Sequence, residues 1–375
     1  MCAGHDQYMR LAVTATQSER THHRTMESAI PSHLQCPRTR PVRASEDYTP
    51  PYPSWVARID PSVKQVAIAY LGVQYRGTAA QTTARRAVLR LKELAARAGG
   101  PPHHDVAYYK DGADFDTLVF IAYWSDPIEL ERWLALPELM QWWAGEDRVN
   151  DGVGWFREII CPGIDRFETL FSTADSFEGV GVLAKAMSGE IQEHAYWGGM
   201  RDRFPISQVD ALRTAGSLLA EGLMPGRVRV RGIDNLALIR SGQEWTHTTG
   251  REREIYLREV EPVLREGMDF LRDQGPDIGC FSNRYMYHVT EGFEPVEKTF
   301  GVSCWQSLEH LERWAESHPT HLQIFGSFMK MVQAMNFDLK LRLYHEVAVV
   351  PAHDQNFEYI NCHSGTGLLR CAKAG

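Results

Sequence analysis

The sequence lacks the cysteine spacings that mark the common cysteine-based sites. Its seven cysteines are scattered over 375 residues, and no two of them form a Cys-x-x-Cys pair. This disfavours a zinc ribbon, a thioredoxin-like redox site and a covalently attached c-type haem. Because scattered, odd-numbered thiols are typical of a reducing compartment, we expect a cytoplasmic protein.

Excess positive charge and long apolar runs are also missing. The formal net charge is −8, so no nucleic-acid partner is expected. No apolar run is long enough to cross a bilayer. The first 25 residues are polar and lack the apolar segment of a secretory signal. We expect residues 1–25 to be a disordered extension, or Met26 to be the functional start.

What the sequence does contain is enough apolar material for two domains. Hydrophobic residues make up 43% of the chain and aromatic residues 10%, as in an ordinary globular protein. Residues 26–60 are rich in proline, which opposes both helices and central strands, so this segment is expected to lie as an extended arm on the surface.

A β-α-β-β-α order then occurs twice along the chain. The apolar periodicities and the Gly/Pro breaks predict each element. The first set is a strand at 65–75, a helix at 82–97, strands at 104–109 and 117–124, and a helix at 128–143. The second set is a strand at 234–241, a helix at 251–273, strands at 279–288 and 298–305, and a helix at 308–316. A further strand is expected at 341–347 and another at 347–350.

Two tryptophan pairs support an internal repeat. Trp124 is followed nine residues later by Trp133, and Trp305 is followed nine residues later by Trp314. The second tryptophan of each pair ends the sequence Leu-Glu-Arg-Trp. We therefore predict an α+β fold with two ferredoxin-like repeats that form a dimeric-α/β-barrel-like core, whose interior offers an apolar pocket.

The predicted domain organisation follows from these elements. It comprises an extension at 1–25, a proline-rich arm at 26–60, a first module at 61–150, linking strands and pocket loops at 151–232, a second module at 233–350, and a C-terminal tail at 351–375.

His321 is the first candidate site residue. Pro319 suits the first position of a helix, so His321 falls in its first turn. Ile324, Phe325 and Phe328 follow at helical spacing and share its face. An imidazole on an apolar face needs a partner. It is either a core histidine bonded to a nearby carbonyl or a ligand of a metal or haem.

Four other polar residues stand at places where they could line a pocket. His345 shares one side of its predicted strand with Leu341 and Leu343. Ser241 ends an apolar strand before Gly242, where a turn-forming serine is the ordinary reading. Arg203 lies in a charged segment before a proline, which favours a solvated loop. Glu168 lies on a predicted strand, where an exposed carboxylate is expected.

Eleven colinear segments resemble the haem-containing aldoxime dehydratases. They include Met200-Arg-Asp-Arg203-Phe-Pro, Ser317-His-Pro-Thr-His321 and Leu341-Arg-Leu-Tyr-His345-Glu-Val. The resemblance runs from Met26 to about Arg370, and the family begins at the position of Met26. The segment around 332–338 is longer than the family pattern, and the segment between 207 and 232 is shorter. The segments are 26–30, 34–39, 70–75, 189–191, 196–198, 200–208, 234–242, 267–273, 316–322, 341–347 and 359–363.

The resemblance implies a lyase that converts an aldoxime, R-CH=N-OH, into a nitrile and water. It implies a b-type haem, active in the ferrous form, with His321 as the axial ligand of the iron. It implies His345 as the distal acid, with Ser241, Arg203 and Glu168 as its catalytic partners. It also implies a homodimer.

These residue types suit the chemistry. Hydroxide is a poor leaving group, so the oxime oxygen needs a proton donor, and histidine titrates in the right range. Glu168 would favour the imidazolium of His345 and resupply its proton, while Ser241 and Arg203 would bind the oxime oxygen.

Three alternatives stay open at this point. A haem peroxidase or chlorite-dismutase relative would also combine a histidine ligand with a distal arginine, since a shared fold does not fix a function. A non-catalytic haem carrier or sensor would need only His321. A protein without haem would use His321 as a core histidine.

Overall fold

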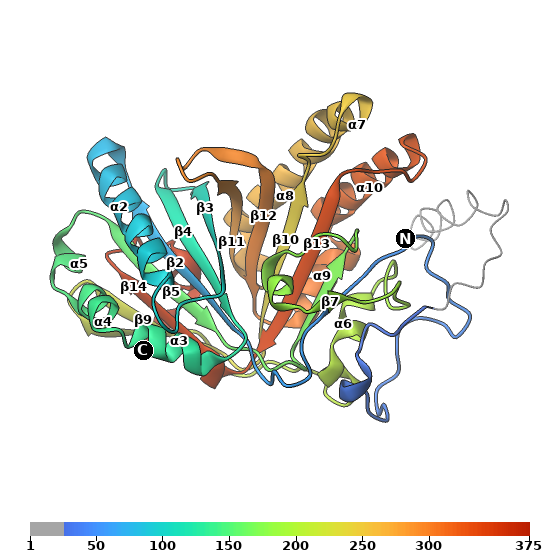
Figure 1. The fold of residues 1–375 in the computed structure, drawn as a ribbon, viewed down its shortest axis with the longest axis horizontal. Helices are drawn as coiled ribbons and strands as arrows, with labels where there is room; N and C mark the ends of the chain where they lie inside the picture. The colour runs from blue at the N-terminus through green and yellow to red at the C-terminus, as the bar shows by residue number, and fades with distance from the viewer. Residues whose placement is uncertain (1–25) are drawn as a thin grey trace.

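A thirteen-stranded sheet forms the centre of the computed structural model, which describes residues 26–375 (Figure 1). The expectations for residues 1–25 lie outside the described part. All neighbouring strands are antiparallel except β15 and β8. The prediction of an α+β fold is confirmed. No helix among residues 26–375 is long and apolar enough to span a membrane. The strand order is β15-β8-β9-β14-β5-β2-β4-β3-β11-β12-β10-β13-β6.

The first half of the sheet contains the strands β5-β2-β4-β3 in that spatial order. Apolar residues fill both faces of β2 and β4, which is typical of central strands. The elements of this half are β2 (Ala67–Tyr75), α2 (Gly77–Ala95), β3 (His103–Lys110), β4 (Asp116–Trp124), α3 (Pro127–Leu134), α4 (Pro137–Ala144), α5 (Asp147–Asn150) and β5 (Gly154–Ile160).

The second half repeats this order as β13-β10-β12-β11. Strands β3 and β11 pair over two residues and join the halves. The elements of this half are β10 (Leu236–Glu244), α7 (Gly250–Ile255), a π-helical turn (Tyr256–Val260), α8 (Glu261–Gln274), β11 (Cys280–Val289), β12 (Pro295–Trp305), α9 (Leu308–Ser317), α10 (Pro319–Ala334) and β13 (Arg342–Val350).

Several predicted elements differ from the observed ones. The helix expected at 251–273 is interrupted by the π-helical turn at Tyr256–Val260. The helix expected at 128–143 is two helices, because Pro137 cannot continue α3 and instead opens α4. Helix α2 begins at Gly77, five residues before the expected start. The two strands expected between 341 and 350 are the single strand β13.

The strand that flanks each half comes from a distant part of the chain. Strand β6 (Phe167–Phe171) pairs with β13 of the second half, and β14 (Gln355–Ile360) pairs with β5 of the first half. The remaining elements lie around these strands. They are β1 (Ala57–Arg58), β7 (Ala186–Met187), α6 (Gly199–Arg203), β8 (Leu219–Met224), β9 (Arg227–Arg231), β15 (Lys373–Ala374) and several short 3₁₀ turns.

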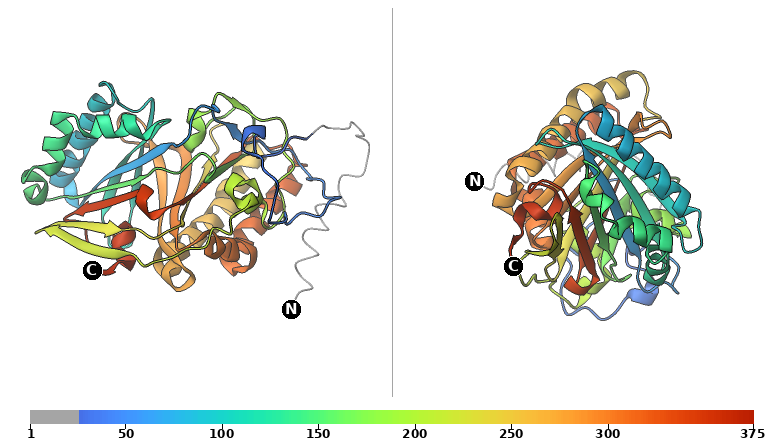
Figure 2. Two further views of the ribbon diagram at one scale, coloured as in Figure 1. Left: turned by 90° about the horizontal axis from the view of Figure 1, so that it is seen from below. Right: turned by 90° about the vertical axis from the view of Figure 1, so that its left-hand side faces the viewer.

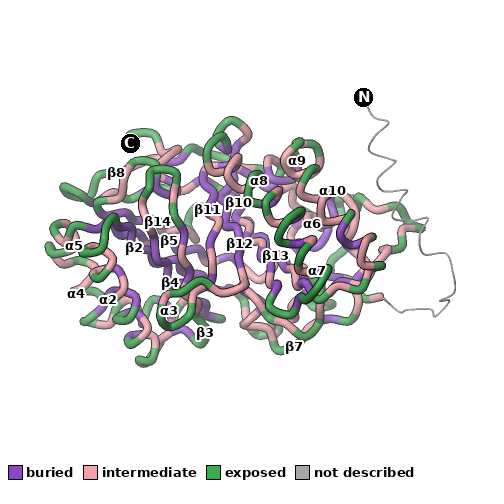
Figure 3. The backbone as a smooth tube through the Cα atoms, turned by 90° about the horizontal axis from the view of Figure 1, so that it is seen from above, coloured by how far each residue is buried: buried purple, intermediate pink, exposed green. Residues whose placement is uncertain are grey.

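The sheet curves, so that its two halves face each other across a packed core. Ile68 and Ile121 of the first half and Leu238 and Val302 of the second half belong to one buried cluster. Helices α2 to α5 gather at one end of the molecule and α8 to α10 toward the other (Figures 1 and 2). Figure 3 shows buried residues along the central strands, whereas the helices carry many intermediate and exposed residues.

The expectation of an apolar pocket between the two halves is wrong, because large side chains fill that space. The candidate site residues point to the opposite face. Ser241 and His345 follow the alternation of Ala237 and Val347, which pack with Trp305 and Trp314 under the helices of the second half. The site therefore lies on the helix-covered face of the sheet.

Candidate functional site

His321 lies in the first turn of α10, where the sequence places it. Pro319 is the first helical residue, and the His318 side chain accepts a hydrogen bond from the Thr320 N–H at the start of the helix. The indole of Trp314 donates to the Thr320 hydroxyl over 3.0 Å and so ties α9 to α10. The His321 ring meets the Trp314 ring edge-on, with 4.6 Å between centroids.

The histidine is held in a state suited to bind a metal. Its Nδ1 lies 2.7 Å from the carbonyl oxygen of Ala315, so Nδ1 carries the proton and donates. The lone pair is then on Nε2. Burial lowers the pKa of His321 to about 4, against the weaker opposite effect of the Ala315 bond. The imidazole is therefore neutral at pH 7, as a metal ligand must be.

The face of α10 that carries His321 is apolar but only half-buried. Ile324, Phe325 and Phe328 are all of intermediate exposure, although their spacing is that of a core-facing stripe. Trp197 adds an aromatic ring, with its centroid 5.5 Å from that of Phe325. A half-covered apolar face beside a neutral imidazole fits a large apolar group with a metal at its centre. No cluster of three or more metal-binding side chains occurs among the described residues.

His345 and Ser241 lie on neighbouring strands of the sheet that faces these helices. They are direct partners in the β10–β13 ladder, so their side chains point to the same face. Both are of intermediate exposure. Within the described residues, the Ser241 hydroxyl has no hydrogen-bond partner. It is therefore free to bind another molecule.

Glu168 and Arg203 meet His345 at a single ring nitrogen. Nη2 of Arg203 lies 2.9 Å from Nε2 of His345, and Oε1 of Glu168 lies 3.1 Å from the same atom. Nε of Arg203 donates to Oε2 of Glu168 over 2.5 Å, and Nη1 donates to the Glu193 carbonyl over 2.8 Å. The structure thus brings Glu168, Arg203, Ser241 and His345 together.

The carboxylate of this group is buried but charged. Burial alone would raise the pKa of Glu168, but Arg203 and His345 outweigh it and hold that pKa below its usual value. The contact between Oε1 of Glu168 and Nε2 of His345 is an ion pair when the imidazole is protonated. Glu168 therefore presents a fixed negative charge to the imidazole.

Three local expectations from the sequence are wrong. Ser241 does not form a turn, because β10 continues through Gly242 to Glu244. Glu168 is not exposed, because β6 pairs with β13 and Arg203 neutralises the carboxylate. Arg203 does not lie in a solvated loop, because 199–203 forms α6 and its side chain is 3% exposed. Each residue is buried because the other is present.

Sequence reasoning missed His194. It is 1% exposed, and neither of its ring nitrogens has a hydrogen-bond partner within the described residues. Burial, and next the charge of Arg203, lower its pKa to about 4. Nothing in the polar local sequence marks it as buried. Trp197 was missed too, although it lies within a segment that carries the family resemblance.

A small cavity lies behind the ion pair. It has a volume of about 40 Å³, and its walls include Glu168, Thr169 and Arg203 together with Pro31 and His33 of the N-terminal arm. That volume is enough for a water molecule beside polar partners.

Known proteins match this chain along most of its length. A family model described as haem-containing dehydratase matches residues 69–368. An aliphatic aldoxime dehydratase of Rhodococcus globerulus is 47% identical over 350 residues, which cover 92% of this chain and 98% of that protein. A phenylacetaldoxime dehydratase of Bacillus sp. strain OxB-1 is 34% identical over 330 residues, which cover 86% of this chain and 93% of that protein.

Solved structures match the fold. The crystal structure of an aldoxime dehydratase in complex with butyraldoxime superimposes with a TM-score of 0.91 at 46% identity, and the match covers 96% of this chain and all of the other. A second aldoxime dehydratase structure gives a TM-score of 0.90 at 48% identity, with coverage of 93% of this chain.

Proposed function

Because the chain belongs to the haem-containing dehydratase family, we propose that it dehydrates aldoximes, R-CH=N-OH, to nitriles and water. The observation that carries this proposal is the arrangement of His345. One of its ring nitrogens faces a buried carboxylate and a guanidinium, and the free Ser241 hydroxyl lies beside it on the next strand. This arrangement suits a general acid that protonates a bound oxygen.

We propose a b-type haem as the cofactor, whose iron Nε2 of His321 would hold. The neutral imidazole and the half-buried apolar face of α10 support this assignment. In the ferrous state the haem would supply an electron-rich iron, which favours cleavage of the N–O bond.

Proton transfer then balances within the site. His345 gives one proton to the oxime oxygen, so that water leaves instead of hydroxide. The carbon of R-CH=N-OH loses one proton as the nitrile forms, and His345 is placed to take it back. The reaction consumes no net proton, and no external proton source is required.

Glu168 therefore has a role different from that of a proton source. Its low pKa makes it a poor acid, whereas its fixed charge stabilises the imidazolium of His345. Arg203 holds both partners in place and retains two further N–H groups that can bind the oxime oxygen. Ser241 donates a second hydrogen bond to that oxygen and orients it.

We also propose the finer description of the fold. The two sets of strands, each flanked by helices on its outer face, support two ferredoxin-like repeats in a barrel-like arrangement. The domain boundaries predicted above, a homodimeric assembly and a cytoplasmic location remain predictions.

Absorption spectroscopy tests the proposed function. The haem-supplemented protein would be reduced with dithionite under nitrogen, and spectra recorded before and after addition of butyraldoxime. We expect a Soret band that shifts on addition and returns as nitrile accumulates. A Soret band that does not respond would move the function toward a peroxidase or a haem carrier. Absence of any haem band would make His321 a core histidine.

A further inference from the structure

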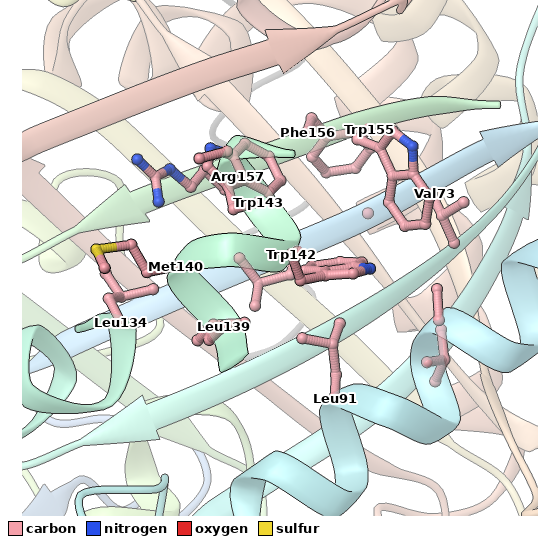
Figure 4. Close-up of a pocket in the computed structure, with 15 residues that line it drawn as sticks. Val73, Leu91, Leu134, Leu139, Met140, Trp142, Trp143, Trp155, Phe156 and Arg157 are labelled. Carbon is pink, nitrogen blue, oxygen red and sulfur yellow. The ribbon is translucent and has the colours of Figure 1, made fainter. Parts of the chain in front are cut away.

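A cavity of about 230 Å³ lies in the first half of the molecule, between the sheet and helices α2 and α4. Its walls are mostly apolar and aromatic, and Figure 4 shows Trp142 of α4 between Leu91 of α2 and the residues of β2 and β5. Met140, which is 54% exposed, and Arg157 both line the cavity. None of the residues assigned above to the proposed reaction lines this cavity.

The cavity occupies the same place in the first half as the candidate site occupies in the second. Trp124 lies opposite Ala67 in β2, and Trp305 lies opposite Ala237 in β10. Leu71 lies four residues after Ala67, and Ser241 lies four residues after Ala237. The partner of Leu71 on β5 is Arg157, and the partner of Ser241 on β13 is His345. Arg157 is thus the positional counterpart of His345.

The helix above the cavity corresponds to α10, but it carries no metal ligand. Helix α4 opens with Pro137, as α10 opens with Pro319. Leu139 lies two residues after Pro137, and His321 lies two residues after Pro319. Because Leu139 stands where the second half has its histidine, a haem has no ligand here.

The charged end of the cavity has an excess of positive charge. The Glu358 carboxylate forms an ion pair with Nη2 of Arg157 at 2.8 Å and accepts a hydrogen bond from Nη2 of Arg229 over 2.8 Å. The buried Arg227 adds a third guanidinium nearby. Burial lowers the pKa of Arg157; the carboxylate of Glu358 opposes this, and the other two arginines add to the lowering. Nε of Arg157 is buried and has no hydrogen-bond partner within the described residues.

We propose that this cavity binds a small carboxylate with a compact apolar body, its carboxylate held by Arg157. A carboxylate would accept from the accessible part of the Arg157 guanidinium, whose side chain is 19% exposed, and would offset the excess charge of the three arginines. The apolar body would lie among Leu71, Leu91 and Trp142. An engineered cavity of about 150 Å³ is enough for benzene, so this cavity has room for an aryl ring and its side chain.

Phenylacetate is a suitable probe, and phenylacetamide is its uncharged counterpart. Binding to the haem-loaded protein would be measured by titration calorimetry, with the Soret band followed in parallel. We expect phenylacetate to bind without a Soret shift and at least about tenfold more tightly than phenylacetamide, because a charge-assisted hydrogen bond is lost in the amide.

Two variants locate the site. Met140→Trp adds bulk at the exposed side of the cavity, and Arg157→Gln removes the guanidinium; each should weaken phenylacetate binding about tenfold or more. Ile128→Trp is the matched control, since Ile128 is 53% exposed and does not line the cavity. It should bind phenylacetate like the unmodified protein.

Three results would overturn the proposal. They are no measurable binding of phenylacetate, equal binding of the acid and the amide, and binding that survives both Met140→Trp and Arg157→Gln. Each of them can be obtained while aldoxime turnover is intact, so the proposal fails or stands independently of the proposed reaction.

Discussion

Nη2 of Arg203 lies 2.9 Å from Nε2 of His345. A guanidinium can only donate, so in this arrangement Nε2 accepts and the neutral imidazole carries its proton on Nδ1. When the ring is protonated on both nitrogens, the Nε2–H instead faces Oε1 of Glu168 at 3.1 Å. Nε2 of His345 therefore has a partner in each protonation state, Arg203 when the ring is neutral and Glu168 when it is protonated. This suits a residue that gives and retakes a proton.

Replacing Arg203 by lysine tests this geometry. Lysine keeps the positive charge but cannot bond Glu168, the Glu193 carbonyl and His345 at once. We expect haem content to stay unchanged and kcat to fall about 100-fold, the lower range for loss of an organised acid. A rise in KM alone, with kcat unchanged, would show that Arg203 binds the substrate but does not position His345.

Glu168→Gln removes the fixed charge and keeps the shape. Without the carboxylate, the negative charge 3.1 Å from Nε2 of His345 is lost, so the alkaline limb of the activity profile should shift to lower pH. The pH profile of kcat measures this shift. Glu168→Asp is the control that keeps the charge, and its profile should stay close to that of the unmodified protein. If the Gln variant also keeps the profile, Glu168 does not act on His345 electrostatically.

The two histidines should separate cofactor binding from turnover. His321→Ala removes the only side chain placed to ligate iron from α10, so we expect the purified protein to lose its Soret band. His345→Ala leaves His321 and α10 unchanged, so the protein should keep its haem while turnover falls about 100-fold or more. Near-normal rates in His345→Ala would make the acid assignment wrong, and full haem content in His321→Ala would make the ligand assignment wrong.

The buried pair of Arg284 and Glu158 joins the two halves of the sheet. Nη2 of Arg284 lies 2.6 Å from Oε1 of Glu158, and the Tyr359 hydroxyl donates to the same oxygen over 2.7 Å. Removing one partner leaves a buried charge, so Arg284→Met should cost about 3–5 kcal/mol of unfolding free energy. The double variant with Glu158→Gln should recover part of that loss. Urea unfolding measures both, and additive losses would contradict the coupling.

Local sequence patterns predicted which segments form helices and strands better than they predicted which of these elements lie side by side. Proline at 319 and the apolar spacing that follows are local signals, and α10 with His321 in its first turn matches them. The break at Pro137 was equally local and was missed. The burial of Glu168 was not predictable in this way, because it depends on pairing with β13, far along the chain.

Which face of the sheet holds the site could not be predicted from the sequence either. Strand β4 is buried on both faces, so its sequence has no alternation to show which face the helices cover. The filled space between the halves became visible only when residues of both halves were seen in one cluster. The burial of Arg203 and His194 could not be predicted, since it results from contacts that sequence spacing does not encode.

Ionisation of the Glu346 carboxyl should lower the free energy of unfolding as the pH rises. Burial raises the pKa of Glu346 from 4.5 to about 7, with Arg240 and the Val180 N–H opposing this and Asp105 and Glu178 adding to it. The folded state therefore holds a proton that the unfolded chain releases above pH 4.5. The stabilising effect is full below that pH and is lost progressively up to about pH 7. The total loss is about 3 kcal/mol.

Glu346→Gln keeps an oxygen for the Val180 N–H and cannot ionise, so it should unfold at higher urea concentration than the unmodified protein at pH 8 but not at pH 5. Glu358→Gln is the matched control. Burial raises the pKa of Glu358, but its arginine partners outweigh this and lower it, so Glu358 is already ionised at both pH values. The effect of Glu358→Gln should therefore be the same at pH 5 and pH 8. If the Glu346 variant also showed no difference between the two, its carboxyl would not be the group that holds the proton.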